Sequence, residues 1–172
     1  CEPYLTCDDR LMQERAAAII DGVRIMLRAL EQDRSGRNVA ALIAIENNKR
    51  DALAAVKKAA SAQPGIATVA VPTRYPMGSE KHLIRAVTGK EVPARALAPE
   101  IGMLVHNVGT AFAIHRAVRF AKPLISRIVT LSGGAVESPQ NFEVLIGTPV
   151  SALLRAAGGL REPPHVCSWA VQ

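Results

Sequence analysis

The sequence predicts an α/β fold, in which helices flank a parallel sheet and a smaller β-rich unit follows. Two short apolar runs, residues 39–45 and 66–71, have the length and the residue types of strands that are buried on both faces of a parallel sheet. Segments with apolar residues at helical spacing precede and separate these runs. We therefore expect a strand–helix–strand unit with a right-handed crossover, and a third short strand at residues 101–105.

The first predicted helix covers residues 8–30, because acidic residues open it, three consecutive alanines favour it and apolar residues recur at helical spacing. Gly22 lies in its middle, where we expect close packing against the sheet. Asn48 and Thr148 are the expected N-caps of two later helices. The remaining predicted helices cover residues 49–62, 80–88, 110–120 and 149–157.

The pattern changes near Pro123. Residues 125–132 and 142–146 are typical of two strands of a β-hairpin, with a Gly-Gly pair and a turn between them. We therefore divide the chain into an α/β domain at residues 1–123 and a small, incomplete β-rich domain at residues 124–172.

Composition limits the possible partners before any motif is considered. Hydrophobic residues make up 49% of the 172 residues, which is enough for a core, and no apolar run approaches the roughly 20 residues of a membrane span. The net charge of +6 attracts anions such as dinucleotide phosphates, an acidic protein or an anionic membrane surface. Aromatic residues are only 3% of the chain, which argues against single-stranded nucleic acid, so no nucleic-acid partner is expected.

The cysteines support neither a disulfide framework nor a metal site. Cys1, Cys7 and Cys167 are an odd number without a C-x-x-C pair, and the histidines have no close pairing. Reduced thiols and no metal ligand are therefore expected. Because the sequence begins at Cys1 without a Met or a leader, we expect an excised part of a longer protein.

Three loops should meet at one edge of the predicted sheet: residues 1–4, residues 75–80 and the His106-Asn107 pair. Carboxylates, amides and glycine backbones in such loops can hold a planar heteroaromatic ring. The same residues also have simpler roles, with Gly78 in a tight turn, Asn107 as a helix cap and Glu80 as a first-turn carboxylate. The residue types alone leave both interpretations open.

The ordered motifs resemble the C subunit of the Rnf/Rsx ion-translocating electron-transport complex, over about the first 160 residues. The family patterns are C-E-P-Y-x-T-x-D-D-x-L-M, I-E-x-N-K, Y-P-x-G-x-E-K-x-L-I-x-x-x-T-G-x-E-V-P, x-N-V-G-T-A-x-A-I and R-x-V-T-x-x-G. They occur here at residues 1–12, 45–49, 75–93, 106–114 and 127–133.

The resemblance implies a Rossmann-like domain similar to the NADH- and FMN-binding subunit of respiratory complex I, followed from residue 124 by the start of a soluble-ligand-binding β-grasp domain. It implies electron transfer between NAD(H), FMN and iron–sulfur clusters, other members of the membrane complex as partners, and a peripheral position at the cytoplasmic face of the bacterial inner membrane. The glycine-rich phosphate loop is expected upstream of Cys1, and two 4Fe-4S clusters are expected downstream of these residues. We expect the chain alone to be inactive and to bind FMN poorly.

By the matching motifs, the cofactor-contacting residues are Glu2, Tyr75, Gly78, Glu80 and Asn107, and the resemblance assigns no catalytic residue or metal ligand here. Ser79 and His106 replace a Glu and an Asn of the complex I motifs. Residues 161–172 follow no family pattern and have no assigned role. The alternative hypothesis is a cofactor-free scaffold or docking domain of such a complex.

Overall fold

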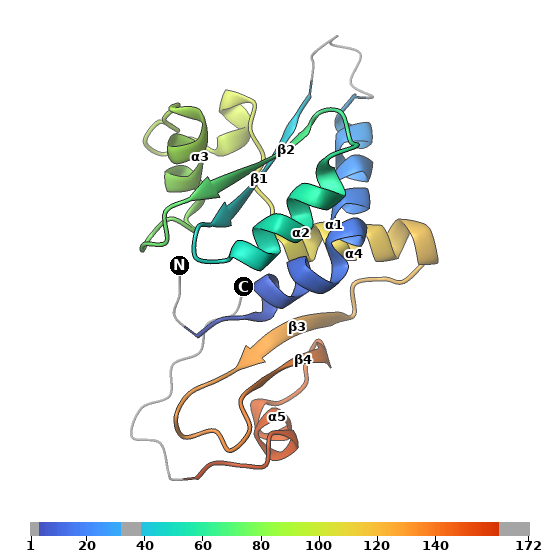
Figure 1. Cartoon of the computed structure of the whole chain (residues 1–172), viewed down its shortest axis with the longest axis vertical. Coiled ribbons are helices and arrows are strands. Elements are labelled where there is room, and N and C mark those ends of the chain that lie inside the picture. Colours follow the sequence, from blue (N-terminus) through green and yellow to red (C-terminus); the bar gives the residue numbers. More distant parts are fainter. Residues whose placement is uncertain (1–3, 32–38, 162–172) are drawn as a thin grey trace.

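The computed structural model describes residues 4–31 and 39–161 (Figure 1). Helices and strands alternate over residues 7–88, two further helices follow over residues 98–120, and a hairpin with one helix comes last. In chain order the elements are α1 (Cys7–Glu31), β1 (Ala41–Glu46), α2 (Arg50–Ala60), β2 (Ile66–Val71), α3 (Glu80–Thr88), the 3-10 helix η1 (Ala98–Ile101), α4 (Val108–Phe120), β3 (Ser126–Leu131), β4 (Gln140–Leu145) and α5 (Val150–Ala156).

The α/β fold with a parallel sheet is confirmed. β1 and β2 pair in parallel over their full length, and α2 connects them as predicted. Ile45 of β1 packs in one core with residues of α1 and α2, and Ile19, Ile45 and Val56 are its largest fully buried side chains. α3 lies beside β2, on the side of the sheet away from α1 (Figure 1). Sheet and helices thus share the apolar interior that the two buried runs predict.

Gly22 packs against α4, so its expected packing against the sheet is wrong. A Cβ atom at Gly22 would lie 1.9 Å from the carbonyl oxygen of Ala111. The missing side chain therefore lets α1 and α4 approach with their backbones almost in contact, and these two helices share the most extensive interface between elements. α1 is also kinked at Arg15, whose φ and ψ are −130° and 26°.

The third predicted strand, at residues 101–105, is wrong. The chain forms η1 immediately before it and then runs without strand pairing. Pro99 lies in the first turn of η1, and Glu100 accepts a hydrogen bond from the backbone N–H of Leu97 at 2.8 Å. Gly102 ends η1 with φ 73°. A proline followed three residues later by a left-handed glycine favours a turn, and the apolar run at residues 101–105 was too short to distinguish a turn from a strand.

Two predicted N-caps are also wrong by one residue. Lys49, and not Asn48, precedes α2, and Pro149, and not Thr148, precedes α5. In each case a turn keeps the expected residue outside the helix: the N–H of Lys49 bonds the carbonyl of Glu46 at 2.9 Å, and that of Thr148 bonds the carbonyl of Leu145 at 3.1 Å. The expected cap at Asn107 is confirmed, because its side chain accepts a hydrogen bond from the N–H of Gly109.

The β-rich unit is an antiparallel hairpin of β3 and β4 with α5 beside it, below the helices in Figure 1. Its buried cluster contains only Leu131, Val136 and Ala157. Within the described residues, no helix is long and apolar enough to cross a membrane. That part of the chain also has no group of acidic, histidine or cysteine side chains that could hold a metal ion. Cys7 is buried and free; Cys1 and Cys167 lie outside the described residues.

Candidate functional site

The loops that follow β1 and β2 are tied together at the carboxyl edge of the sheet. Asn47 follows β1, and its side-chain oxygen accepts hydrogen bonds from the backbone N–H and the hydroxyl of Thr73 at 3.3 and 2.9 Å. Two positions later, the Lys49 ammonium lies 3.7 Å from a carboxylate oxygen of Asp9 in the first turn of α1. This edge therefore collects loop residues from three elements, as expected for an open α/β sheet.

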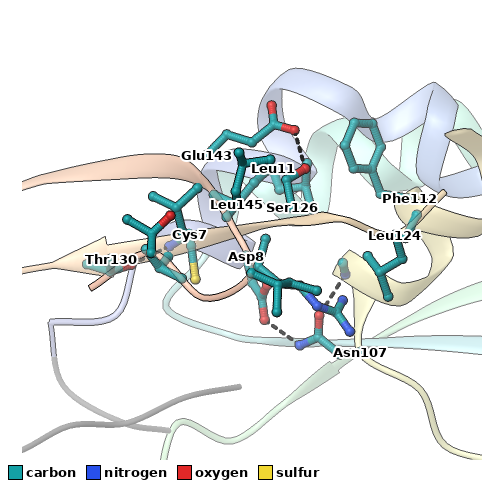
Figure 2. A pocket seen from close by; sticks show the side chains of 18 of the residues that line it. Cys7, Asp8, Leu11, Asn107, Phe112, Leu124, Ser126, Thr130, Glu143 and Leu145 are labelled. Carbon is teal, nitrogen blue, oxygen red and sulfur yellow. Dashed lines mark hydrogen bonds between the residues drawn. The ribbon is translucent and has the colours of Figure 1, made fainter. Parts of the chain in front are cut away.

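Asn107 joins this edge through the neighbouring residue of α1. Its side-chain Nδ2 donates a hydrogen bond to Oδ2 of Asp8 at 2.6 Å, and its Oδ1 accepts the Gly109 N–H at 2.6 Å (Figure 2). Burial raises the pKa of Asp8, and the hydrogen bond from Asn107 opposes part of that rise. Because both ends of the amide have partners, its orientation is fixed, and within the described residues one N–H and one lone pair stay available to a ligand.

Asp8 and Asn107 also line a cleft of about 380 Å³ between the α/β unit and the β-rich unit (Figure 2). Leu11, Phe112 and Leu145 give it a mainly apolar wall. The volume lies within the range of small-molecule sites, and clefts between units are common places for them. Sequence reasoning missed this cleft, because its walls come from segments more than a hundred residues apart.

Charged pairs hold α4 against its two neighbours. Arg119 and His115 of α4 both bond the carboxylate of Asp21 in α1, with contacts of 2.7 and 2.8 Å from Arg119 and 2.7 Å from His115. The Arg119 hydrogen bonds hold the pKa of Asp21 well below its usual range. On the other side, Arg116 bonds Glu143 of β4 at 2.5 Å and lowers the pKa of that carboxyl group. These pairs fix α4, the helix that Asn107 caps.

Two family models match this chain. The model described as the Nuo51 FMN-binding domain matches residues 1–116, which is more than half of the sequence. The chain belongs to this FMN-binding domain family. The SLBB domain model matches residues 128–171, which include the β3–β4 hairpin and α5.

Curated relatives, each named as the C subunit of an ion-translocating oxidoreductase complex, are similar to nearly the whole chain. The Rhodobacter capsulatus protein is 51% identical over 165 residues, which are 95% of this chain and 31% of that protein. The Serratia proteamaculans protein is 51% identical over 92% of this chain and 22% of its own length. The Pseudomonas aeruginosa protein is 49% identical over 92% of this chain and 20% of its own length. The resemblance to these C subunits is thus confirmed, and the chain spans about a fifth to a third of these relatives.

Three further residues that we predict to contact the cofactor lie between the end of β2 and the first turn of α3. Tyr75 is 80% exposed, Gly78 lies in an exposed turn, and Glu80 is an exposed first residue of α3. Buried Met77 anchors that loop. In the part of the chain that the structure describes, no hydrogen bond joins these residues to Asn107, and Glu2 lies outside the described residues.

The available groups fit one part of FMN better than another. An exposed tyrosine ring, a carboxylate and a fixed amide with spare hydrogen-bonding capacity suit a polar heteroaromatic ring. The phosphate is different, because phosphate loops cluster backbone N–H groups with closely spaced glycines. The 12 glycines of this chain include no three within six consecutive positions. The residues present therefore fit the flavin ring, without a glycine-rich cradle for its phosphate.

Proposed function

We propose that this chain forms the flavin-contacting part of a subunit that transfers electrons between NAD(H), FMN and iron–sulfur clusters in an ion-translocating membrane complex. The single observation that carries the proposal is the match to an FMN-binding domain over residues 1–116, the region in which Asn107 presents a fixed, partly free amide. The clusters would be held by residues outside this chain. The other members of the complex, at the cytoplasmic face of the bacterial inner membrane, would be its partners.

FMN, when bound, supplies the exchange between two-electron hydride transfer and single-electron transfer. This chain's residues would hold and tune it. Asn107 would bond a polar atom of the ring with the N–H and lone pair that Asp8 and Gly109 leave available. Tyr75 would pack its exposed ring against the cofactor, and Gly78 would let the backbone approach. Glu2, which lies outside the described residues, would be a further contact of the cofactor. The Glu80 carboxylate would disfavour additional negative charge on the reduced ring, which lowers the flavin's potential.

Flavin content tests the proposal directly. In full-length protein, Asn107→Ala should weaken FMN binding roughly five- to hundredfold, because a buried ring polar atom would lose its partner at a cost of about 1–3 kcal/mol. Glu80→Gln should raise the flavin potential and change NADH oxidation with an artificial acceptor, while the fold stays intact. Wild-type flavin content, potential and turnover in both variants would contradict the proposal.

A cofactor-free scaffold is the second candidate, because no three glycines of this sequence lie within six consecutive positions, as a phosphate-cradling loop would need. The two candidates predict different results for full-length protein without added cofactor. A flavin absorbance spectrum that stays with the protein through gel filtration supports the first. Colourless protein that still joins the complex, and that does not take up added FMN, supports the second.

A further inference from the structure

We propose that the β-rich unit positions Asn107, through Thr130 of β3 and Asp8 of α1. The two residues would act as positioning residues for the amide, and the part that concerns flavin rests on the function proposed above. At the start of α1, as at any helix start, backbone N–H groups have no intrahelical partners.

The missing partners at this helix start come from the other unit. The hydroxyl oxygen of Thr130 accepts hydrogen bonds from the backbone N–H groups of Thr6 and Cys7, at 3.1 and 3.0 Å. Thr6 immediately precedes α1, and residues of its type commonly cap their own helix. Here its hydroxyl donates instead to Asn141 of β4 at 3.0 Å. The cap of α1 is thus supplied by a residue 124 positions away in the chain.

Thr130 is itself held in place by the hairpin. Its hydroxyl donates to the same side-chain oxygen of Asn141 at 2.8 Å, across the paired positions of β3 and β4. A hydroxyl has one hydrogen to donate and two lone pairs, so two accepted bonds and one donated bond use its full capacity. The geometry of the hairpin therefore determines where α1 begins.

The next residue of α1 carries this constraint to Asn107. Asp8 directly follows Cys7, and its carboxylate accepts the Asn107 side-chain hydrogen bond at 2.6 Å. Hydrogen bonds to a charged acceptor are short and about twice as strong as neutral ones. Figure 2 shows Thr130, Cys7, Asp8 and Asn107 along one side of the cleft. Loss of either Thr130 or Asp8 should therefore release the amide from its fixed orientation.

Two pairs of variants with matched controls test this chain of contacts. Thr130→Val removes the hydroxyl at nearly constant shape, and Thr130→Ser keeps it. Asp8→Ala removes the acceptor, and Asp8→Asn keeps an oxygen at the same place. The controls are Thr88→Val, which removes a hydroxyl that bonds Ile84 and Lys90 far from the site, and Glu14→Ala, which removes an exposed α1 carboxylate that pairs with Arg10.

The first readout needs no flavin. In flavin-free protein, NMR hydrogen exchange of the Gly109 N–H reports its bond to Asn107. We expect exchange to accelerate roughly tenfold in Asp8→Ala and several-fold in Thr130→Val, with little change in the conservative variants and controls. Unchanged exchange in Asp8→Ala and Thr130→Val, both folded by thermal melt, would overturn the inference. If Asp8→Ala fails to fold, Thr130→Val alone tests the inference. Its Gly109 N–H should exchange faster than that of Thr130→Ser and Thr88→Val, and equal exchange in all three would overturn the inference.

The second readout is the FMN dissociation constant of full-length protein. It should rise roughly five- to tenfold in Asp8→Ala and less in Thr130→Val, with Thr130→Ser unchanged. If Asn107→Ala weakens FMN binding but Asp8→Ala and Thr130→Val do not, the positioning inference is overturned while the proposed function stands. If the NMR effect is present but Asn107→Ala binds FMN normally, the contacts stand and the proposed function of Asn107 fails.

Discussion

The α/β unit and the β-rich unit of this chain differ in how they are held together. The α/β unit has a continuous core in which Ile19, Ile45 and Val56 are fully buried. The β-rich unit buries only three side chains in its cluster and leaves Leu145 and Ile146 more than 60% exposed. A hairpin with so small a core is marginal by itself. Its stability must depend on its contacts with α1 and α4, and in return it caps α1.

Truncating a buried side chain in each core should give the largest change in stability. Ile19→Ala should lower the free energy of unfolding by about 2–5 kcal/mol, because it leaves a cavity in a closed core. Leu131→Ala should destabilise the β-rich unit and leave the exchange protection of β1 and β2 close to wild type. Denaturant melts with residue-resolved hydrogen exchange measure both. Equal loss of protection in both units after Leu131→Ala would mean that the two cores are one.

One glycine in each unit shows how tightly that unit is packed around it. Gly22→Ala should destabilise by about 1–3 kcal/mol or more, because the new methyl group meets the backbone of Ala111 and not a movable side chain. The control is Gly134→Ala in the β-rich unit, where a Cβ atom would have nothing within 4 Å, and it should be nearly neutral. Thermal unfolding of both variants measures the two changes in stability. A neutral Gly22→Ala would contradict the close approach of α1 and α4.

Truncation separates the units themselves, with the boundary that we propose near Pro123. A chain that ends at Lys122 should stay folded, because its main core is complete. It should nevertheless be less stable than the whole chain by about 1–3 kcal/mol, because the N–H groups of Thr6 and Cys7 lose their acceptor. Residues 124–172 alone should not fold. NMR dispersion and thermal melts of both pieces test this, and an unfolded 1–122 piece would contradict it.

The smallest expected effect is a dependence on pH within the α/β unit. The folded pKa of Asp21 lies below its unfolded value, mainly because of the Arg119 hydrogen bond, so its contribution to stability is present above about pH 4 and is lost as the pH falls further. Asp21→Asn should cost about 1 kcal/mol at pH 7, since Arg119 is half exposed, and should flatten the pH dependence below pH 4. The control Glu14→Gln affects an exposed pair and should change neither the stability at pH 7 nor the pH dependence of stability below pH 4. Urea melts at pH 7 and pH 3 measure the free energy of unfolding at each pH. If that free energy changes with pH as much in Asp21→Asn as in the wild type, Asp21 does not cause the pH dependence.

Local patterns predicted most of the fold. The two apolar runs became β1 and β2, and the helix predicted at residues 80–88 agrees with α3 residue for residue. The failures lie where a turn competes with a regular element, as at residues 101–105, or where packing between distant helices decides, as at Gly22. Periodicity contains no information about which surface a glycine will meet.

The site was predictable only where single residues have local roles. Asn107 as the cap of α4 and Glu80 in the first turn of α3 follow from their positions before and within a helix. The Asp8 to Asn107 bond and the Thr130 cap of α1 join residues 99 to 124 positions apart, and no spacing rule predicts such pairs. The consecutive aspartates in the first motif were the signal that could have directed attention to Asp8.

The most direct test is the FMN affinity of full-length Asn107→Ala, measured by flavin fluorescence titration beside the wild type and the Glu14→Ala control. Asn107 is the residue at which the cofactor proposal and the contacts from both units meet. We expect a dissociation constant roughly five- to hundredfold higher for Asn107→Ala, with Glu14→Ala close to wild type. Equal affinity in all three proteins would contradict a flavin-contacting role for this site and would favour the cofactor-free scaffold.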